Sequence, residues 1–225
     1  MAKKIRRKDL LKSEDEFLSF SARAFSFFSA HVRELKIAGI LIVAGSIIFL
    51  GTTTYIRHVN NKGQEAYNTA YSAMAEYFNP EADPGKLREA RDLFTKVVDN
   101  HARSKAADLA LPQLAFLKFM EGESEESIRL YSDFKSKAAK KDDFVTLSSL
   151  ALAVAHEANG DLDRAIALIE PIAGDRGSHF RETALFTLTR LYALAGRQSR
   201  AAGLAGDFIA EFQRSPFVPI MKTYL

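Results

Sequence analysis

The stretch from Ile37 to Ile56, IAGILIVAGSIIFLGTTTYI, contains no charged residue and is flanked by Lys36 and Arg57. A helix of that length spans about 30 Å, which is the thickness of the hydrocarbon core of a bilayer. A helix is the conformation expected there, because it satisfies its backbone hydrogen bonds internally. A buried core helix is the alternative, but a run of this length without a polar face favours a membrane span. The sequence therefore predicts a single transmembrane helix over residues 37–56.

The basic residues are concentrated before this stretch. Residues 1–36 hold nine Lys and Arg against five Asp and Glu, whereas the rest of the chain holds 22 against 23. Because the cytoplasmic side of a span carries the excess of basic residues, we expect residues 1–36 in the cytoplasm and the larger part outside. The sequence LGTTTYIRH after the apolar run lacks a small-x-small cleavage site, which favours an uncleaved signal anchor over a cleaved signal peptide. No basic stripe is visible in the larger part, so we expect no nucleic-acid binding.

A second helix is expected within the basic tail. Ser13 and Glu16 form a capping box, which predicts that a helix begins there. Apolar and aromatic residues then recur at helical spacing, at Phe17, Phe20, Ala24, Phe28 and His31. This amphipathic, Phe-rich helix either lies among the lipid headgroups with its phenyl rings inward, or extends the membrane helix into the cytoplasm.

The larger part of the chain contains a repeat. Gly85, Gly122, Gly160 and Gly196 are separated by 37, 38 and 36 residues, and each is followed by small or apolar residues at the same offsets. Offset +5 holds Ala90, Ser127, Ala165 and Ala201, and offset +12 holds Val97, Phe134, Ile172 and Phe208. Offsets +5, +8, +9 and +12 fall on one face of a helix. A glycine that ends one helix, followed by a second helix with a small residue, predicts a helix–turn–helix unit.

The spacing resembles that of the tetratricopeptide repeat (TPR), in which an alanine follows the inter-helix glycine by five residues. Gly160-Asp161-Leu162-Asp163-Arg164-Ala165 is the best match, followed by Gly196 with Ala201. The chain lacks the tryptophan of that family and has an insertion, NPEADPG, at Asn79–Gly85. The predicted fold is all-α, with one N-terminal transmembrane helix followed by a TPR-like α-solenoid of about four helix pairs.

The order of the parts resembles a narrower family. A basic tail, a Phe-rich segment, one span, a helix beginning EAYNTAYSAM and a C-terminus ending PFVPIMKTYL together are similar to the YfgM-type ancillary subunit of the Sec translocon. The resemblance implies an inner-membrane protein with a periplasmic repeat domain. It also implies that this domain associates with the SecYEG translocon and with periplasmic chaperones.

No pattern of catalytic or metal-binding residues is present in the sequence. The chain has no cysteine, which excludes disulfides, cysteine metal sites and thiol nucleophiles. His156-Glu157 begins an HExxH pattern, but Gly160 stands where the second histidine would be. His156 is therefore interpreted as a partly buried packing residue. We expect no enzyme activity, no cofactor, no metal and no small-molecule substrate.

The remaining candidate site is a groove lined by the first helix of each unit. Carrying the TPR frame over to this sequence assigns to it Leu109, Phe116, Phe119, Met120, Leu150, Val154, Glu157, Phe186 and Arg190. Such a groove suits an extended or helical hydrophobic segment of a protein partner. The alternative is that these residues belong to the core or are covered by the C-terminal residues Pro216–Leu225.

The predicted organisation has four parts. Residues 1–36 form the cytoplasmic tail, 37–56 the anchor, 57–62 a short linker, and 63–225 the repeat domain. The leading functional hypothesis is a non-enzymatic extracytoplasmic scaffold that binds proteins near the Sec translocon and assists the handling of secreted or envelope proteins. Two alternatives stay open: a self-associating assembly or structural factor of the cell envelope, and a cytoplasm-facing adaptor if the topology is reversed.

Overall fold

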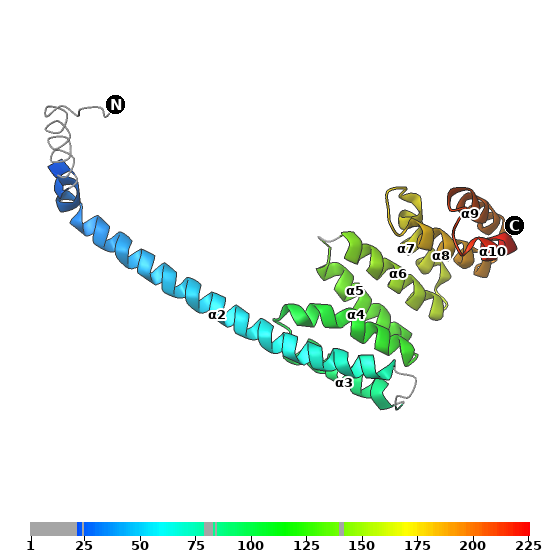
Figure 1. The fold of residues 1–225 in the computed structure, drawn as a ribbon, viewed down its shortest axis with the longest axis horizontal. Helices are drawn as coiled ribbons and strands as arrows, with labels where there is room; N and C mark the ends of the chain where they lie inside the picture. The colour runs from blue at the N-terminus through cyan, green and yellow to red at the C-terminus, as the bar shows by residue number, and fades with distance from the viewer. Residues whose placement is uncertain (1–21, 24, 79–82, 84, 140–141) are drawn as a thin grey trace, which may run out of the picture. The chain divides into compact units, whose positions relative to one another are not determined.

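The repeat region is built from consecutive helices. The computed structural model describes residues 22–23, 25–78, 83, 85–139 and 142–225. In chain order its elements are α2 (Val32–Tyr77), α3 (Gly85–Asn100), α4 (Lys105–Met120), α5 (Ser124–Lys137), α6 (Asp142–Ala158), α7 (Leu162–Gly174), α8 (Arg181–Leu194), α9 (Gln198–Glu211), α10 (Val218–Met221) and the 3₁₀ helix η1 (Lys222–Tyr224) (Figure 1). No strand occurs within these described ranges, which confirms the prediction of an all-α fold.

The chain divides into two compact units, Met1–Arg57 and His58–Leu225. Helix α2 contributes its first part to the N-terminal unit and its last part to the C-terminal unit. The linker expected at residues 57–62 lies inside this helix. The capping box at Ser13 and Glu16 lies outside the described residues, as do Phe17, Phe20 and Ala24.

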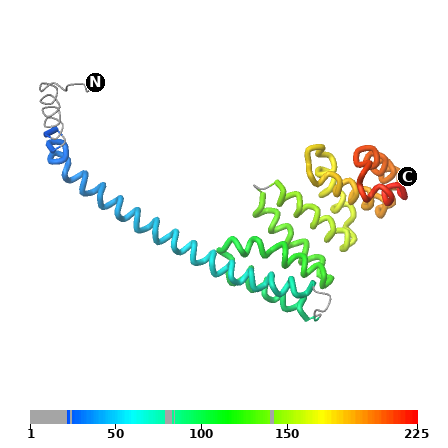
Figure 2. Tube along the Cα trace, in the orientation of Figure 1, coloured from blue at the N-terminus to red at the C-terminus, as the bar shows by residue number. Residues whose placement is uncertain are grey.

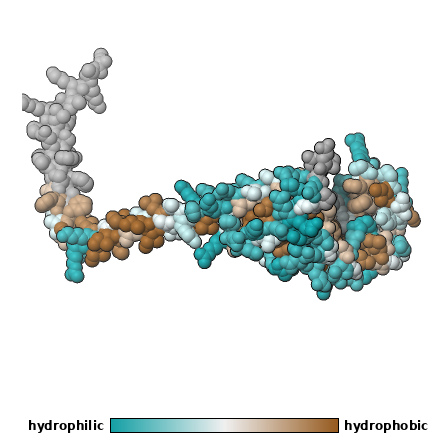
Figure 3. All heavy atoms as spheres, turned by 90° about the horizontal axis from the view of Figure 1, so that it is seen from below, coloured by the Kyte–Doolittle hydropathy of each residue, from teal (hydrophilic) through white to brown (hydrophobic). Residues whose placement is uncertain are grey.

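The N-terminal unit exposes its apolar residues. The side chains of residues 37–52 are all exposed, and they form the brown stretch of helix in Figure 3. Within the described part of the chain, α2 is the one helix that is long and apolar enough to cross a membrane, by length and composition. Phe25, Phe27 and Phe28 are exposed as well, and the Phe27 ring stacks on His31 with centroids 4.6 Å apart.

The C-terminal unit consists of helix pairs. The last part of α2 is followed by α3, α4 by α5, α6 by α7, and α8 by α9, and Figure 2 traces these pairs along the chain. Three inter-helix turns contain the expected glycines in the left-handed region, with φ of +82° at Gly122, +81° at Gly160 and +73° at Gly196. Residues other than glycine are strained at such a φ, so glycine is the residue that suits this helix-ending conformation. These three glycines therefore end their helices as the repeat predicts. Gly85 differs, because it is the first residue of α3 and its N–H donates to Asp83 Oδ1 at 2.8 Å.

The repeat columns form the core. All four small residues at offset +5 are fully buried, and the large residues at offset +12 are buried as well. The buried side chains fall into two clusters. One includes Phe94, Leu117 and Phe134 from the first two units, and the other includes Ile169, Leu191 and Phe208 from the last two. The TPR-like solenoid of about four helix pairs is therefore confirmed.

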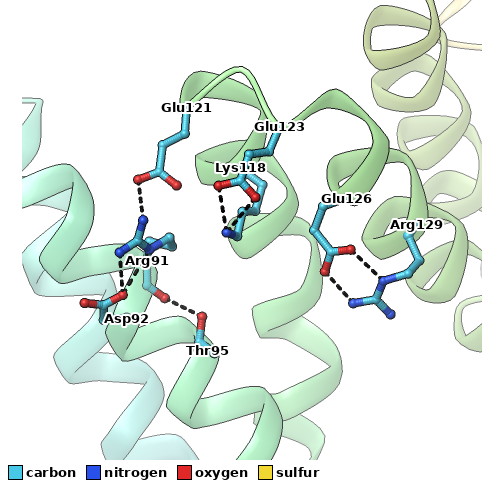
Figure 4. A network of polar contacts seen from close by, with 8 residues as sticks. All are labelled: Arg91, Asp92, Thr95, Lys118, Glu121, Glu123, Glu126 and Arg129. Carbon is cyan, nitrogen blue, oxygen red and sulfur yellow. Dashed lines mark hydrogen bonds and ion pairs between the residues drawn. The ribbon is translucent and has the colours of Figure 1, made fainter. Parts of the chain in front are cut away.

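Ion pairs link neighbouring helices around the turn after α4 (Figure 4). Arg91 on α3 donates to Glu121 Oε1 at 2.8 Å, which joins the first unit to the second. Lys118 donates to Glu123 Oε2 at 2.9 Å across the turn. Within α5, Arg129 donates to both carboxylate oxygens of Glu126, and this hydrogen bonding lowers the pKa of Glu126. Glu121 Oε1, Glu123 and Glu126 therefore make structural contacts, whereas Glu121 Oε2 is buried without a hydrogen-bond partner among the described residues.

Helix α2 comes very close to the start of α4 at Gly63. A Cβ at this position would overlap Ser104 Oγ and lie 2.5 Å from Ser104 Cβ. Ser104 is buried and caps α4 by accepting the Ala107 N–H at 3.2 Å, so it has little freedom to move. Next to it, Asn60 Oδ1 accepts the Lys105 N–H at 3.0 Å.

We expect Gly63→Ala to lower the free energy of unfolding by about 1–3 kcal/mol, the usual cost of overpacking. The measurement is urea denaturation of residues 58–225, the compact unit that contains both core clusters. Gly203→Ala in α9 is the matched control, because a Cβ there meets no atom within 4 Å. Because alanine favours a helix more than glycine does, the free energy of unfolding of the control variant should rise by about 0.5–1 kcal/mol. Equal stability changes in the two variants would contradict the close approach at Gly63.

Candidate functional site

An open groove of about 500 Å³ lies within the C-terminal unit, on one side of α4. Its walls come from the last part of α2, from α4 and from α6, and α5 contributes two aromatic rings. The lining residues are Tyr67, Met74, Phe78, Leu109, Pro112, Gln113, Phe116, Tyr131, Phe134, Phe144, Leu147, Ser148 and Ala151. This concave groove is where the first helices of three successive units meet.

Helical periodicity places the lining residues on a separate face from the core. On α4, Leu109, Gln113 and Phe116 follow at intervals of four and three residues, which keeps them on one face. The other sides of α4 bury Leu111, Leu114 and Leu117. Helix α4 is therefore apolar nearly all round, because one face packs in the core and another lines the groove.

Aromatic contacts hold the groove walls. Phe78 and Phe116 have ring centroids 6.2 Å apart, and Phe134 meets Phe144 edge-on at 5.9 Å. Tyr67 meets the buried ring of Phe94 edge-on at 5.6 Å. Rings paired in this way favour a single arrangement of the walls.

The groove is uncharged. None of its lining side chains is Asp, Glu, Lys, Arg or His. Burial raises the pKa of Tyr131 to about 12, so its phenol stays neutral at physiological pH. Ser148 Oγ already donates to the Phe144 carbonyl at 2.6 Å. The surface offers large apolar side chains and few polar partners, which suits the apolar face of another protein segment.

The sequence-assigned groove residues are distributed over several environments. Leu109 and Phe116 line the groove together, whereas Phe119 and Met120 stand at the end of α4, outside its lining. Val154 is exposed and also outside the lining.

The residues assigned from the third and fourth units make other contacts. Leu150 packs against the second core cluster, and Phe186 lies against the ring of Phe217 at 4.6 Å. Glu157 and Arg190 meet in an ion pair, in which Arg190 Nη2 donates to Glu157 Oε2 at 2.6 Å. The C-terminal segment thus covers Phe186.

Some lining residues were absent from the sequence-based assignment. Leu147 could have been assigned, because it precedes Gly160 by thirteen residues, as Leu109 precedes Gly122. Tyr131 and Phe134 had no such signal, because their offsets in the repeat belong to the packing face. Phe144 stands further from the turn glycine than any assigned residue.

Within the described part of the chain, the His, Asp and Glu side chains include no group of three that could hold a metal ion. His156 is buried, as interpreted from the repeat, and its Nδ1 lies 3.4 Å from Asp161 Oδ2.

Comparison with known proteins agrees with the repeat. The family model of the tetratricopeptide repeat-like domain matches residues 31–185, which make up more than half of the chain. No curated protein matches. Among solved structures, the chain is similar to a Podosopora anserina protein assigned as a kinesin light chain, with nearly identical TPR-like repeats. The TM-score is 0.57 at 19% identity, over 74% of this chain and 84% of that one. A single-residue variant of the same protein gives 0.58 at the same identity and coverage. At this identity the similarity concerns the fold alone.

The groove predicts binding of an apolar dye such as 1-anilinonaphthalene-8-sulfonate to residues 58–225. Leu147→Asp should weaken this binding about fivefold, because a half-exposed leucine contributes about 1 kcal/mol of apolar contact. Leu194→Asp is the matched control: Leu147 is 46% exposed and lines the groove, whereas Leu194 is 57% exposed and lies outside it. Fluorescence titration measures both dissociation constants. An equal loss in the two variants would show that the dye binds elsewhere.

Proposed function

Because the chain belongs to the tetratricopeptide repeat-like domain family, we propose that it is a membrane-anchored scaffold for protein–protein interaction. Its repeat domain faces the periplasm from the inner membrane and binds partners near the Sec translocon. The partners are subunits of SecYEG, periplasmic chaperones, and secreted or envelope proteins in transit. The protein performs no chemistry of its own.

One observation carries the membrane anchor: the apolar side chains of residues 37–52 are all exposed. Burying a large aliphatic or aromatic side chain stabilises a protein by about 1.5–3 kcal/mol, so leaving this many in water is strongly unfavourable. Surrounding them with lipid removes that cost without any change in the helix. The excess of basic residues in 1–36 supports a cytoplasmic N-terminus.

The scaffold role is supported by the concave groove. The groove is apolar, uncharged and open. The chain that forms it belongs to a family whose fold typically serves protein interaction. Placement near the translocon is supported by the order of the parts, from basic tail to repeat domain, which is similar to the YfgM-type subunits.

Topology is the first test of this proposal. The chain has no cysteine, so Ser199→Cys in α9 and Ser29→Cys before α2 each introduce one thiol at an exposed position. In intact spheroplasts, a membrane-impermeant maleimide should label the Ser199→Cys variant before lysis and the Ser29→Cys variant only after lysis. The reverse pattern would place the repeats in the cytoplasm and favour the adaptor hypothesis.

Partner binding is the second test. Purification of the full chain in mild detergent should recover SecYEG subunits, and Leu147→Asp should lower their recovery several-fold while Leu194→Asp leaves it unchanged. Immunoblotting of the eluates measures this recovery. A well-solubilised protein that recovers no translocon subunit would contradict the translocon proposal, and a homo-oligomer as the main species would favour the self-association hypothesis.

A further inference from the structure

A second concavity runs along α6 on a different face from the concave groove. It consists of two adjoining hollows of about 520 and 320 Å³, which share Lys135, Val145 and Leu168. Its floor is a row of α6 residues at helical spacing, namely Val145, Ser149, Leu152 and His156. Helix α5 forms one wall and α7 the other. We refer to this feature as the α6 crevice.

Lys135 is the one cation whose side chain lines both hollows. It is half-buried and has no ion-pair partner among the described residues. Its neighbour on α5, Lys137, pairs with Asp108 at 2.7 Å. An ammonium group without a counter-charge attracts an anionic ligand.

The other ionisable groups of the crevice already have partners. His156 Nδ1 lies 3.4 Å from Asp161 Oδ2. Asp175, at the opposite end, accepts the Gly177 N–H at 2.9 Å and interacts electrostatically with Arg181. Lys135 is therefore the cation shared by both hollows, whereas the Asp175 carboxylate lines the smaller hollow alone.

The α7 wall also contains a backbone carbonyl that lacks its usual helical hydrogen bond. Pro171 stands inside α7 and has no N–H to donate, so the carbonyl of Ala167, four residues earlier, lacks its usual helical partner. Both residues line the smaller hollow. An extended peptide has free backbone N–H groups that can donate to this carbonyl, whereas the interior of a helix has none.

We propose that the α6 crevice is a second binding surface, which takes an extended segment of a partner protein carrying an acidic side chain. The carboxylate pairs with Lys135, a backbone N–H donates to the Ala167 carbonyl, and apolar side chains of the segment contact Val145 and Leu168. The stretch of helix from Val145 to His156 extends about 16 Å, which matches about five residues of extended chain. This surface is independent of the concave groove and of the membrane topology.

The test uses the full chain in detergent and a fluorescein-labelled octapeptide of alternating Ser and Val with one central Glu. Two further peptides have Gln or Lys in place of the Glu. Fluorescence anisotropy should show roughly tenfold tighter binding of the Glu peptide than of the Gln peptide, the difference expected for one charge-assisted hydrogen bond. Lys135→Glu should reverse the preference, so that the Lys peptide binds best.

Three controls keep this outcome specific. Lys96→Glu, an equal charge change at an exposed position on α3, should leave the preference intact. Lys135→Gln should abolish the preference while keeping the thermal unfolding curve of the parent chain. Leu147→Asp, in the concave groove, should have no effect. Absence of Glu-peptide binding, or binding that Leu147→Asp removes and Lys135→Glu does not, would overturn the proposal and leave the proposed scaffold function untouched.

Discussion

The repeat domain depends on the close approach of its paired helices at four small side chains. Ala90, Ser127, Ala165 and Ala201 occupy the same position in successive units, and each is fully buried. A larger side chain there would hold the two helices of a pair apart and leave voids around the buried residues at offset +12. Because each pair packs only on its neighbours, this spacing repeated along the chain determines where the first helices stand. The concave groove is a consequence of that regular placement.

The fold could be predicted from sequence because its determinants are local and repeated. Three turn glycines, the small residues at offset +5 and the apolar residues at the other offsets recur at fixed positions. An ambiguous assignment in one unit is therefore resolved by comparison with the other units. Gly85 shows the limit of this reasoning, since it matches the spacing yet begins a helix instead of ending one. The groove was harder to predict, because its composition depends on single units. Tyr131 shares its column with the fully buried Phe94 and Ile169, yet it reaches the groove lining. Phe186 is covered by the ring of Phe217, which follows the last repeat and therefore has no equivalent in the other units.

Helix α6 separates two differently built halves of the repeat domain. The buried cores on either side are distinct clusters, and α6 buries Ser149 at the offset where α4 and α8 bury Leu111 and Leu185. Serine fills less space than leucine, and Ser149 lines the smaller hollow of the α6 crevice. The concave groove is apolar, whereas the α6 crevice is partly polar and contains a cation. Helix α6 therefore contributes residues to two surfaces of different chemistry.

Apolar side chains are exposed in two places, the concave groove and residues 37–52. The extent of exposure differs between the two places, and it determines which surroundings suit each of them. In the concave groove, residues such as Phe116 and Tyr131 are partly covered by neighbouring helices, and Ser148 and Gln113 lie among them. A small recessed surface of this kind persists in water and is available to a partner, because neighbouring helices cover part of its side chains. Residues 37–52 have no neighbouring helix in the described part of their unit and no polar face, so nothing there covers them. Water solvates such an apolar surface poorly, whereas the hydrocarbon chains of lipid solvate it well. The proposed partner binding and the proposed membrane insertion thus rest on the same property, the exposure of apolar side chains, which is limited in the groove and complete in residues 37–52.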